Sequence, residues 1–113
     1  MPENCPFCRI VRGEIPATVL VDTDDAMVFR DLNPKAPTHV LVIPKRHVAT
    51  LNEADDGVEL GNLMRLAARV AADEGIAESG YRVVVNTNDD GGQTVGHLHL
   101  HVLGGRHMTW PPG

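Results

Sequence analysis

Residues 97–103 read His97-Leu98-His99-Leu100-His101-Val102-Leu103, so three histidines alternate with apolar residues. Successive side chains of a β-strand point to opposite faces of the sheet, and this alternation is therefore typical of a strand that is buried on one face. We expect the three imidazoles to share one face of such a strand. The apolar residues should point the other way, toward a core that is covered by a helix.

Three imidazoles on one face have a purely structural interpretation and a catalytic one. A half-exposed strand could merely tolerate histidine, but serine, threonine or lysine would serve a solvated face equally well. A single metal held by all three is excluded by distance, since His97 and His101 would lie ~13 Å apart along the strand. The histidines should therefore divide their roles. His99 is best flanked for chemistry, because neutral imidazole is a competent nucleophile and its neighbours can donate hydrogen bonds to an anion.

The remainder of the chain predicts an α+β domain around this strand. Apolar residues in 58–72 recur at intervals of three and four, as they do on one face of a long helix. A short helix is expected in residues 5–13, and the other strands are expected in residues 18–21, 26–29, 39–43 and 81–85. The prediction is one domain over residues 1–113, a mainly antiparallel sheet of about five strands with a helix covering one face.

Composition and charge limit the classes of partner. The chain has 113 residues, 42% of them hydrophobic, and a formal net charge of -5, as expected of an ordinary globular protein. It lacks the basic surface that nucleic acid binding requires, so any phosphate should be held locally by a few aimed donors. No export signal or membrane-spanning segment is recognisable, and the expected location is the cytoplasm, away from membranes.

Cys5 and Cys8 form a Cys-x-x-Cys pair close to the start of the sequence. In a reducing cytoplasm such a pair indicates metal or redox use more than a structural disulfide. Two thiolates fill half of a tetrahedral zinc site, and two histidines would have to complete it. The alternative is a pair of reduced cysteines in a short helix, and the spacing alone leaves both interpretations open.

Residues 97–103 match in full the His-x-His-x-His-x-x pattern of the histidine-triad (HIT) superfamily, in which x is apolar. The similarity extends along nearly the whole chain and is strongest to the Hint branch, the histidine triad nucleotide-binding proteins. The segments that resemble this branch are residues 5–15, 29–31, 36–39, 42–47, 90–93 and 104–113, and the last of them contains Trp110-Pro111-Pro112-Gly113.

The resemblance implies a HIT-like fold with one long and one short helix, and a homodimer joined through the long helix and a sheet edge into one continuous sheet. It also implies hydrolysis of purine nucleoside phosphoramidates. His99 would be the nucleophile that forms a nucleotidyl-histidine, and His101 would bind the phosphate oxygens. His39 would support the triad from behind, and His97 would complete the set of catalytic histidines.

The resemblance further implies a set of nucleotide contacts. They comprise Asp31 at the ribose hydroxyls, Asn86, Gln93 and Thr94 near the phosphate with His99 and His101, Phe7, Ile10, Phe29 and Leu32 around the base, and Trp110 in the C-terminal signature. Asp31 has a simpler alternative role as a turn cap. Arg30, Gly96 and His107 depart from residues that are frequent in this branch, which bears on base and leaving-group preference.

Zinc-containing relatives imply that His47 and His97 complete the site begun by Cys5 and Cys8, whereas other Hint proteins lack the cysteines and need no metal. A zinc-bound His97 would fix the strand beside His99 and would not transfer protons.

Two other functions compete with phosphoramidase. One is dinucleoside polyphosphate hydrolysis, which the Trp110-Pro111-Pro112-Gly113 ending disfavours, and the other is a dimeric nucleotide-binding adaptor with incidental turnover.

Overall fold

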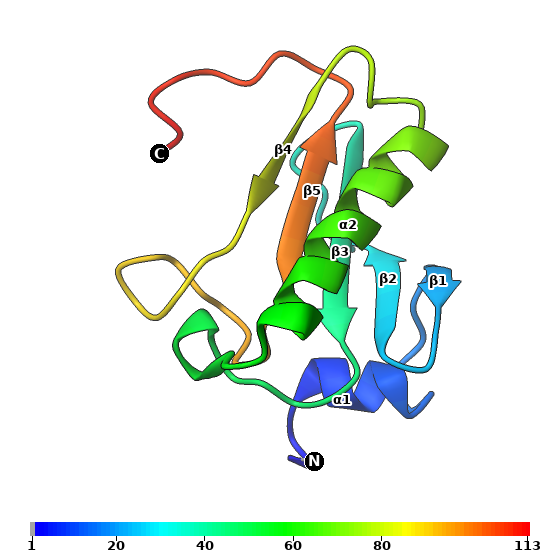
Figure 1. Ribbon diagram of the computed structural model, residues 1–113, viewed down its shortest axis with the longest axis vertical. Coiled ribbons are helices and arrows are strands. Elements are labelled where there is room, and N and C mark those ends of the chain that lie inside the picture. Colours follow the sequence, from blue (N-terminus) through cyan, green and yellow to red (C-terminus); the bar gives the residue numbers. More distant parts are fainter. Residues whose placement is uncertain (1) are drawn as a thin grey trace.

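Five strands form one antiparallel sheet in the order β1-β2-β3-β5-β4 in the computed structural model, which describes residues 2–113 (Figure 1). The strands are β1 (Val19–Asp22), β2 (Ala26–Arg30), β3 (Thr38–Pro44), β4 (Tyr81–Val84) and β5 (Leu100–Gly104). The helices are α1 (Pro6–Val11), the single 3-10 turn η1 (Leu51–Glu53) and α2 (Gly57–Asp73). The predicted α+β class, with its antiparallel sheet and one long and one short helix, is confirmed.

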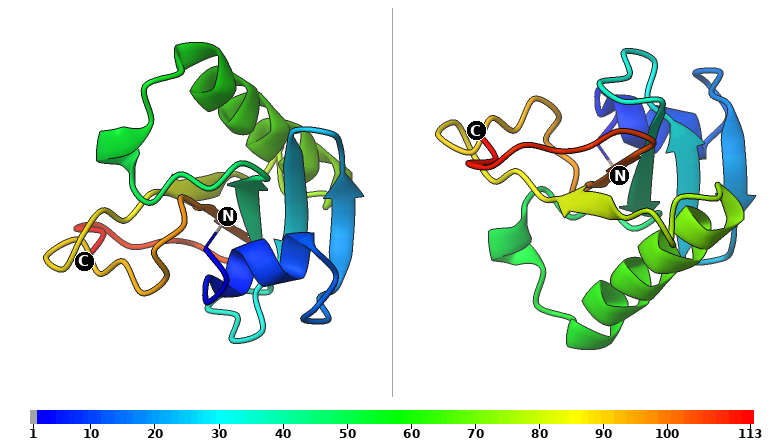
Figure 2. Two further views of the ribbon diagram at one scale, coloured as in Figure 1. Left: turned by 90° about the horizontal axis from the view of Figure 1, so that it is seen from below. Right: turned by 90° about the horizontal axis from the view of Figure 1, so that it is seen from above.

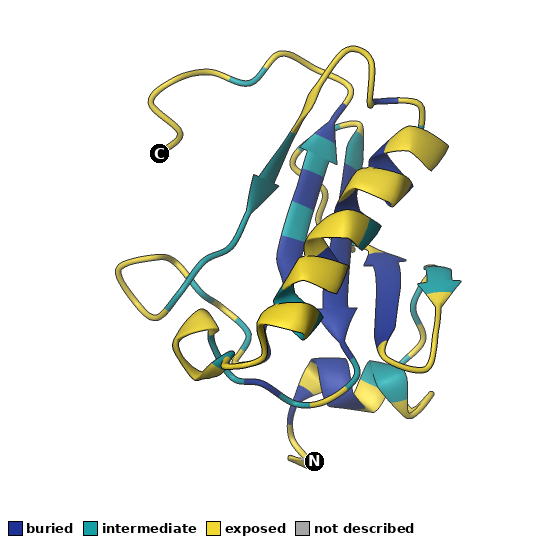
Figure 3. Ribbon diagram, viewed as in Figure 1, coloured by how far each residue is buried: buried dark blue, intermediate teal, exposed yellow. Residues whose placement is uncertain are grey.

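The two α-helices lie on opposite faces of the sheet (Figure 2). α2 covers the larger core, in which Val40, Val42, Leu100 and Val102 of the central strands pack with Leu63, Ala67, Val70 and Ala71 of the helix. α1 covers a smaller core that contains Phe7, Cys8, Phe29, Leu41 and Ile43. Consequently β3 is buried almost throughout, whereas the outer face of α2 is exposed (Figure 3).

The ends of α2 follow ordinary capping chemistry. The Asp56 carboxylate accepts hydrogen bonds from the backbone N–H groups of Val58 and Glu59, which have no partner inside the helix. Gly75 follows the last turn at a φ of 77°, the left-handed conformation that glycine adopts without strain. No helix within residues 2–113 combines the length and apolar character needed to cross a membrane, and the cytoplasmic location stays a prediction.

β5 begins three residues later than predicted, at Leu100 in place of His97. The ladder between β3 and β5 runs from Thr38 opposite Gly104 to Val42 opposite Leu100. Beyond this pair the backbone N–H of Leu98 donates to the carbonyl oxygen of Val48 at 2.6 Å, so it cannot continue the ladder to Pro44. The alternation nevertheless continues through the irregular residues, because Leu98 is 1% exposed and joins Leu100 in the core under α2.

Leu100 provides a test of this packing, since its side chain is 2% exposed in the core between the sheet and α2. Leu100→Ala should lower the free energy of unfolding by ~2–5 kcal/mol, because it removes apolar contacts and leaves a cavity. Urea denaturation measures the change. The exposed Val58 on α2 supplies the control, and Val58→Ala should change stability by less than ~0.5 kcal/mol. Equal losses in the two variants would contradict the described core.

Candidate active site

A cavity of about 290 Å³ opens between α1, the end of β2 and the segment before β5. Its lining includes eight of the eleven predicted nucleotide contacts: Phe7, Ile10, Phe29, Asp31, Leu32, Thr94, His99 and His101. The rest of the lining was not predicted, and it consists of residues 6, 15–17, 30, 41 and 95. Leu41 was not predicted as a lining residue because only the pairing of the strands places it there. Leu41 of β3 lies between Phe29 of β2 and His101 of β5 in the sheet. A larger hollow, about 610 Å³, lies between α2 and the β1–β2 turn and contains none of the predicted site residues.

Three predicted nucleotide contacts lie outside the cavity lining. The Gln93 amide donates to the carbonyl oxygens of Ala49 and Val95 at 2.8 and 2.9 Å, and its own oxygen accepts the N–H of Asn88. Gln93 therefore holds the loop that carries Thr94. Asn86 is half-buried just beyond β4, and Trp110 is 81% exposed on the C-terminal segment. Contact of these residues with a nucleotide stays a prediction.

The hydrogen bonds of His99 determine which of its ring nitrogens is free. Its Nδ1 lies 2.7 Å from the carbonyl oxygen of His97. Because a carbonyl oxygen only accepts, Nδ1 carries the hydrogen and Nε2 carries the lone pair. Burial lowers the pKa of His99, which keeps the ring neutral near pH 7. Phe7 packs perpendicular to this ring, with centroids 5.1 Å apart, and restricts its rotation.

His39 and His101 are linked in a second hydrogen-bonded series. The backbone N–H of Lys35 donates to Nδ1 of His39 at 3.0 Å, so His39 carries its own hydrogen on Nε2. That nitrogen lies 2.9 Å from Nδ1 of His101, which must accept. Burial, with His99 and His39 nearby, lowers the pKa of His101 to about 4. Neutral His101 therefore has its remaining hydrogen on Nε2 and can act as a donor in the cavity that it lines.

Asp31 caps a turn and also lines the cavity. Its Oδ1 accepts the backbone N–H of Asn33 at 2.8 Å, which is the turn-capping contact. Its Oδ2 lies 3.4 Å from Nε2 of His39, and the side chain is 21% exposed at the cavity. The carboxylate therefore remains available to a ligand while it caps the turn.

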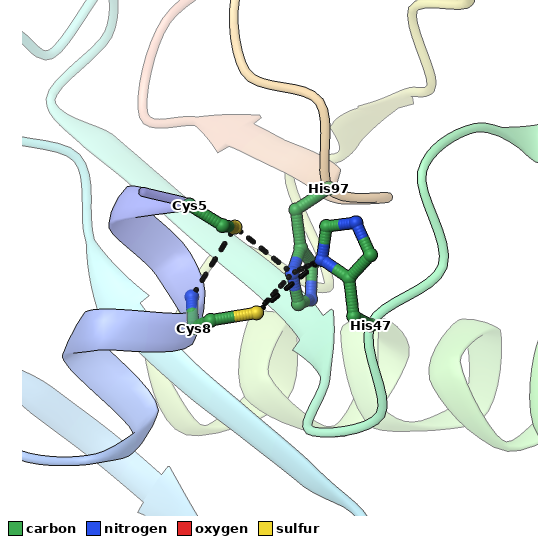
Figure 4. A group of neighbouring side chains, drawn as sticks. All are labelled: Cys5, Cys8, His47 and His97. Atoms are coloured by element: carbon green, nitrogen blue, oxygen red, sulfur yellow. Dashed lines mark hydrogen bonds between the residues drawn. The ribbon is translucent and has the colours of Figure 1, made fainter. Parts of the chain in front are cut away.

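Cys5, Cys8, His47 and His97 converge at the start of α1 (Figure 4). Their nearest ligand atoms all lie within 4.8 Å of one another. The two sulfurs lie 3.5 Å from Nδ1 of His97, Nδ1 of His47 lies 3.3 Å from the Cys8 sulfur, and the two Nδ1 atoms are 3.2 Å apart. A zinc tetrahedron with ordinary bond lengths needs ~3.5 Å between sulfur and nitrogen and ~3.3 Å between nitrogens. The four residues thus have the spacing of a zinc ligand set.

The surroundings of this cluster suit a metal as well. Nε2 of His97 lies 2.8 Å from the carbonyl oxygen of Pro44 and donates to it, which leaves the Nδ1 lone pair directed at the sulfurs. Burial and the hydrogen bond with Cys5 raise the pKa of the Cys8 thiol to about 11, and a cation would displace that proton on binding. Asp31, His39 and His101 also lie close together. However, Nε2 of His39 keeps its hydrogen, so this second group is a hydrogen-bonded series and offers no complete set of lone pairs.

Comparison with known proteins identifies the relatives of this chain. The model of the HIT domain family matches residues 12–108. The purine nucleoside phosphoramidase of Escherichia coli (strain K12) is 46% identical over 108 residues, which cover 94% of this chain and 91% of that protein. The crystal structure of a HIT family hydrolase from Legionella pneumophila Philadelphia 1 superposes with a TM-score of 0.95 at 54% identity, covering 97% of this chain and 100% of that one. A histidine triad protein from Clostridium difficile gives a TM-score of 0.90 at 38% identity, with 96% of each chain covered.

Proposed function

The chain belongs to the HIT domain family, and we propose that it hydrolyses purine nucleoside 5'-phosphoramidates or related nucleotidyl bonds through a covalent nucleotidyl-histidine. It is a hydrolase, as its Legionella relative is named, and the substrate class follows the name of its E. coli relative. The observation that carries the proposal is the hydrogen bond from Nδ1 of His99 to the carbonyl of His97, which leaves a neutral Nε2 lone pair beside an apolar cavity.

In the first step, Nε2 of His99 attacks the α-phosphorus opposite the leaving amine. The new nitrogen–phosphorus bond forms as the bond to the amine breaks, and the amine leaves with the bonding electron pair and a proton taken from solvent. The phosphorylated imidazole becomes cationic, and the carbonyl oxygen 2.7 Å from its Nδ1–H stabilises that charge. His101 donates from Nε2 to a phosphate oxygen, because its Nδ1 is occupied by His39.

Water then attacks the phosphorus of the intermediate and gives up a proton to solvent, as the phosphorus–nitrogen bond breaks and its electron pair returns to Nε2 of His99. This step releases the nucleoside monophosphate and restores the neutral imidazole. Two successive in-line displacements should give net retention of configuration at phosphorus. The purine base would lie against Phe7, Ile10 and Phe29, whose side chains wall the cavity. Asp31 would accept hydrogen bonds from the ribose hydroxyls with the carboxylate that reaches the same cavity.

We propose zinc for the site formed by Cys5, Cys8, His47 and His97. The spacing of the sulfur and nitrogen atoms and the donor set of two thiols and two imidazoles support this metal. A bound ion would tie α1 to the residues before β5. Because Phe7 of α1 contacts both His97 and His99, the ion would also hold one wall of the cavity in place.

We also propose a homodimer joined through α2 and the free edge of β4. β4 pairs with β5 on one side only and is an edge of the sheet. One side of α2 is exposed and carries Gly57, Gly61, Met64 and Ala68. Met64, the largest of these residues, is 50% exposed. A Cβ atom at Gly61 would touch nothing in this chain. Glycine inside a helix costs ~1 kcal/mol relative to alanine, and close approach of a second helix would account for it.

His99→Ala tests the central step. Hydrolysis of adenosine 5'-phosphoramidate should fall by at least ~1,000-fold, because no other side chain presents the nucleophile at that position. Affinity for AMP should change by about tenfold or less, since the donor from His101 remains. Alkaline quenching followed by mass spectrometry should detect a nucleotidyl adduct on His99 in the wild type. Wild-type turnover in the variant, or an adduct on a different residue, would refute the covalent mechanism.

Elemental analysis of protein purified without chelator tests the metal site, and about one zinc per chain is expected. Cys8→Ser should lower both the zinc content and the melting temperature, because binding of the ion contributes to folding. Some hydrolysis should survive, since His99 attacks without a metal. His107→Ala is the control, because it removes an exposed histidine outside the cluster and should leave the zinc content unchanged. Full stability with both thiols free and no zinc bound would refute the site.

Sedimentation equilibrium tests the dimer. The wild type should sediment as two chains, and Met64→Glu should shift it toward one chain, because a buried, unpaired carboxylate is unfavourable in an interface. Asn62→Glu adds the same charge on the exposed side of α2 that faces the β1–β2 turn, and it should leave the dimer intact. A monomeric wild type, or equal dissociation in both variants, would rule out this interface.

A further inference from the structure

We propose that Arg106 is a positioning residue that fixes the tautomers of His39 and His101 through the backbone of Lys35. The guanidinium donates to the carbonyl oxygen of Lys35 from Nη2 at 3.0 Å and from Nε at 3.3 Å. The N–H of the same residue donates to Nδ1 of His39, and His39 in turn donates to His101. A surface cation is thereby connected, through one backbone residue and one imidazole, to a histidine that lines the cavity.

The loop that contains Lys35 gains little support from packing, because residues 32–35 are exposed. Pro34 and Pro37 have fixed φ angles but no N–H groups, so they stiffen the loop without donating hydrogen bonds. Asp31 holds the start of the loop by accepting the N–H of Asn33. Arg106 holds the loop at Lys35 in the same way. The N–H of Lys35 in turn fixes the tautomer of His39.

Gly105 allows Arg106 to reach this position. Its φ is 89°, a conformation that side chains with a Cβ rarely adopt. A Cβ atom there would lie 2.8 Å from Cβ of Pro37, so only glycine lets the chain after β5 pass this close to the loop. The contact of Gly105 with Pro37 and the hydrogen bonds of Arg106 to Lys35 together hold two segments that lie 71 residues apart in the sequence.

The tautomers matter because a shift of the ring hydrogen in His39 forces a shift of the ring hydrogen in His101. If the Lys35 N–H moved away, the hydrogen of His39 could shift from Nε2 to Nδ1, and Nε2 would then present a lone pair. His101 would then have to donate from its own Nδ1, and its Nε2 would carry a lone pair. A lone pair repels a phosphate oxygen, whereas the N–H of the native tautomer donates to it. Arg106 therefore keeps His101 a donor, and this consequence for catalysis rests on the proposed function.

Long-range ¹H–¹⁵N spectra of ligand-free protein read these tautomers directly. In the wild type both His39 and His101 should carry hydrogen on Nε2. Arg106→Ala should introduce a measurable population with hydrogen on Nδ1 of both residues, and kcat for adenosine 5'-phosphoramidate should fall about two- to tenfold. Arg106→Lys keeps one donor and should restore most of both signals. Arg69→Ala, which removes an exposed guanidinium on α2, should change neither tautomer nor rate.

Native tautomers in Arg106→Ala would overturn the inference, even if hydrolysis slowed, because the slowing would then reflect general loosening. An equal tautomer change in Arg69→Ala would overturn it as well. Failure of the wild type to hydrolyse phosphoramidates would refute the proposed function only, since the tautomers are read without substrate. Melting temperatures of the three variants identify any that lose the fold, and Arg106→Lys then carries the test.

Discussion

The pairing register of β3 and β5 is the constraint on which the site depends. With Leu41 opposite His101 and Leu103 opposite His39, the two histidines are diagonal neighbours on the α1 face of the sheet. Val40, Val42, Leu100 and Val102 then all point into the core beneath α2. A slip of one residue would bring imidazoles into that core and expose the aliphatic side chains. Burial of apolar side chains on one face therefore fixes the geometry of the histidines on the other.

The end of the same ladder separates the surroundings of His97 from those of His99. The N–H of Leu98 donates to Val48 outside the sheet, and the carbonyl oxygen of Pro44 receives the N–H of His97. This directs Nδ1 of His97 to Cys5 and Cys8, whereas the carbonyl of His97 itself receives the N–H of His99. Neighbouring histidines of one motif thus point to different clusters, because each backbone carbonyl fixes the tautomer of one ring.

Much of this arrangement was predictable from periodicity. The apolar spacing in α2, the strand segments and the common face of the triad all follow from local patterns. The late start of β5 was not predictable from residues 97–103, because it results from the hydrogen bond of Leu98 to Val48, a residue far away in the sequence. Gln93 was expected near phosphate, but its amide is occupied by Ala49 and Val95, and only the folded loop reveals these partners. The contact of Arg106 with Lys35 was also missed, since an exposed arginine carries no local signal of which carbonyl it meets.

The contact between α1 and the residues before β5 has a consequence for how the molecule is made. Cys5 and His97 are 92 residues apart, and β5 lies between β3 and β4 in the sheet. During synthesis β4 has no partner within the sheet until β5 leaves the ribosome, and the cavity lacks His99 until the same moment. Contacts of such long sequence separation slow folding because the loop must close before they form. The nascent chain therefore completes this cavity in one late event, and products truncated before β5 lack His101 and keep unpaired strand edges prone to aggregation.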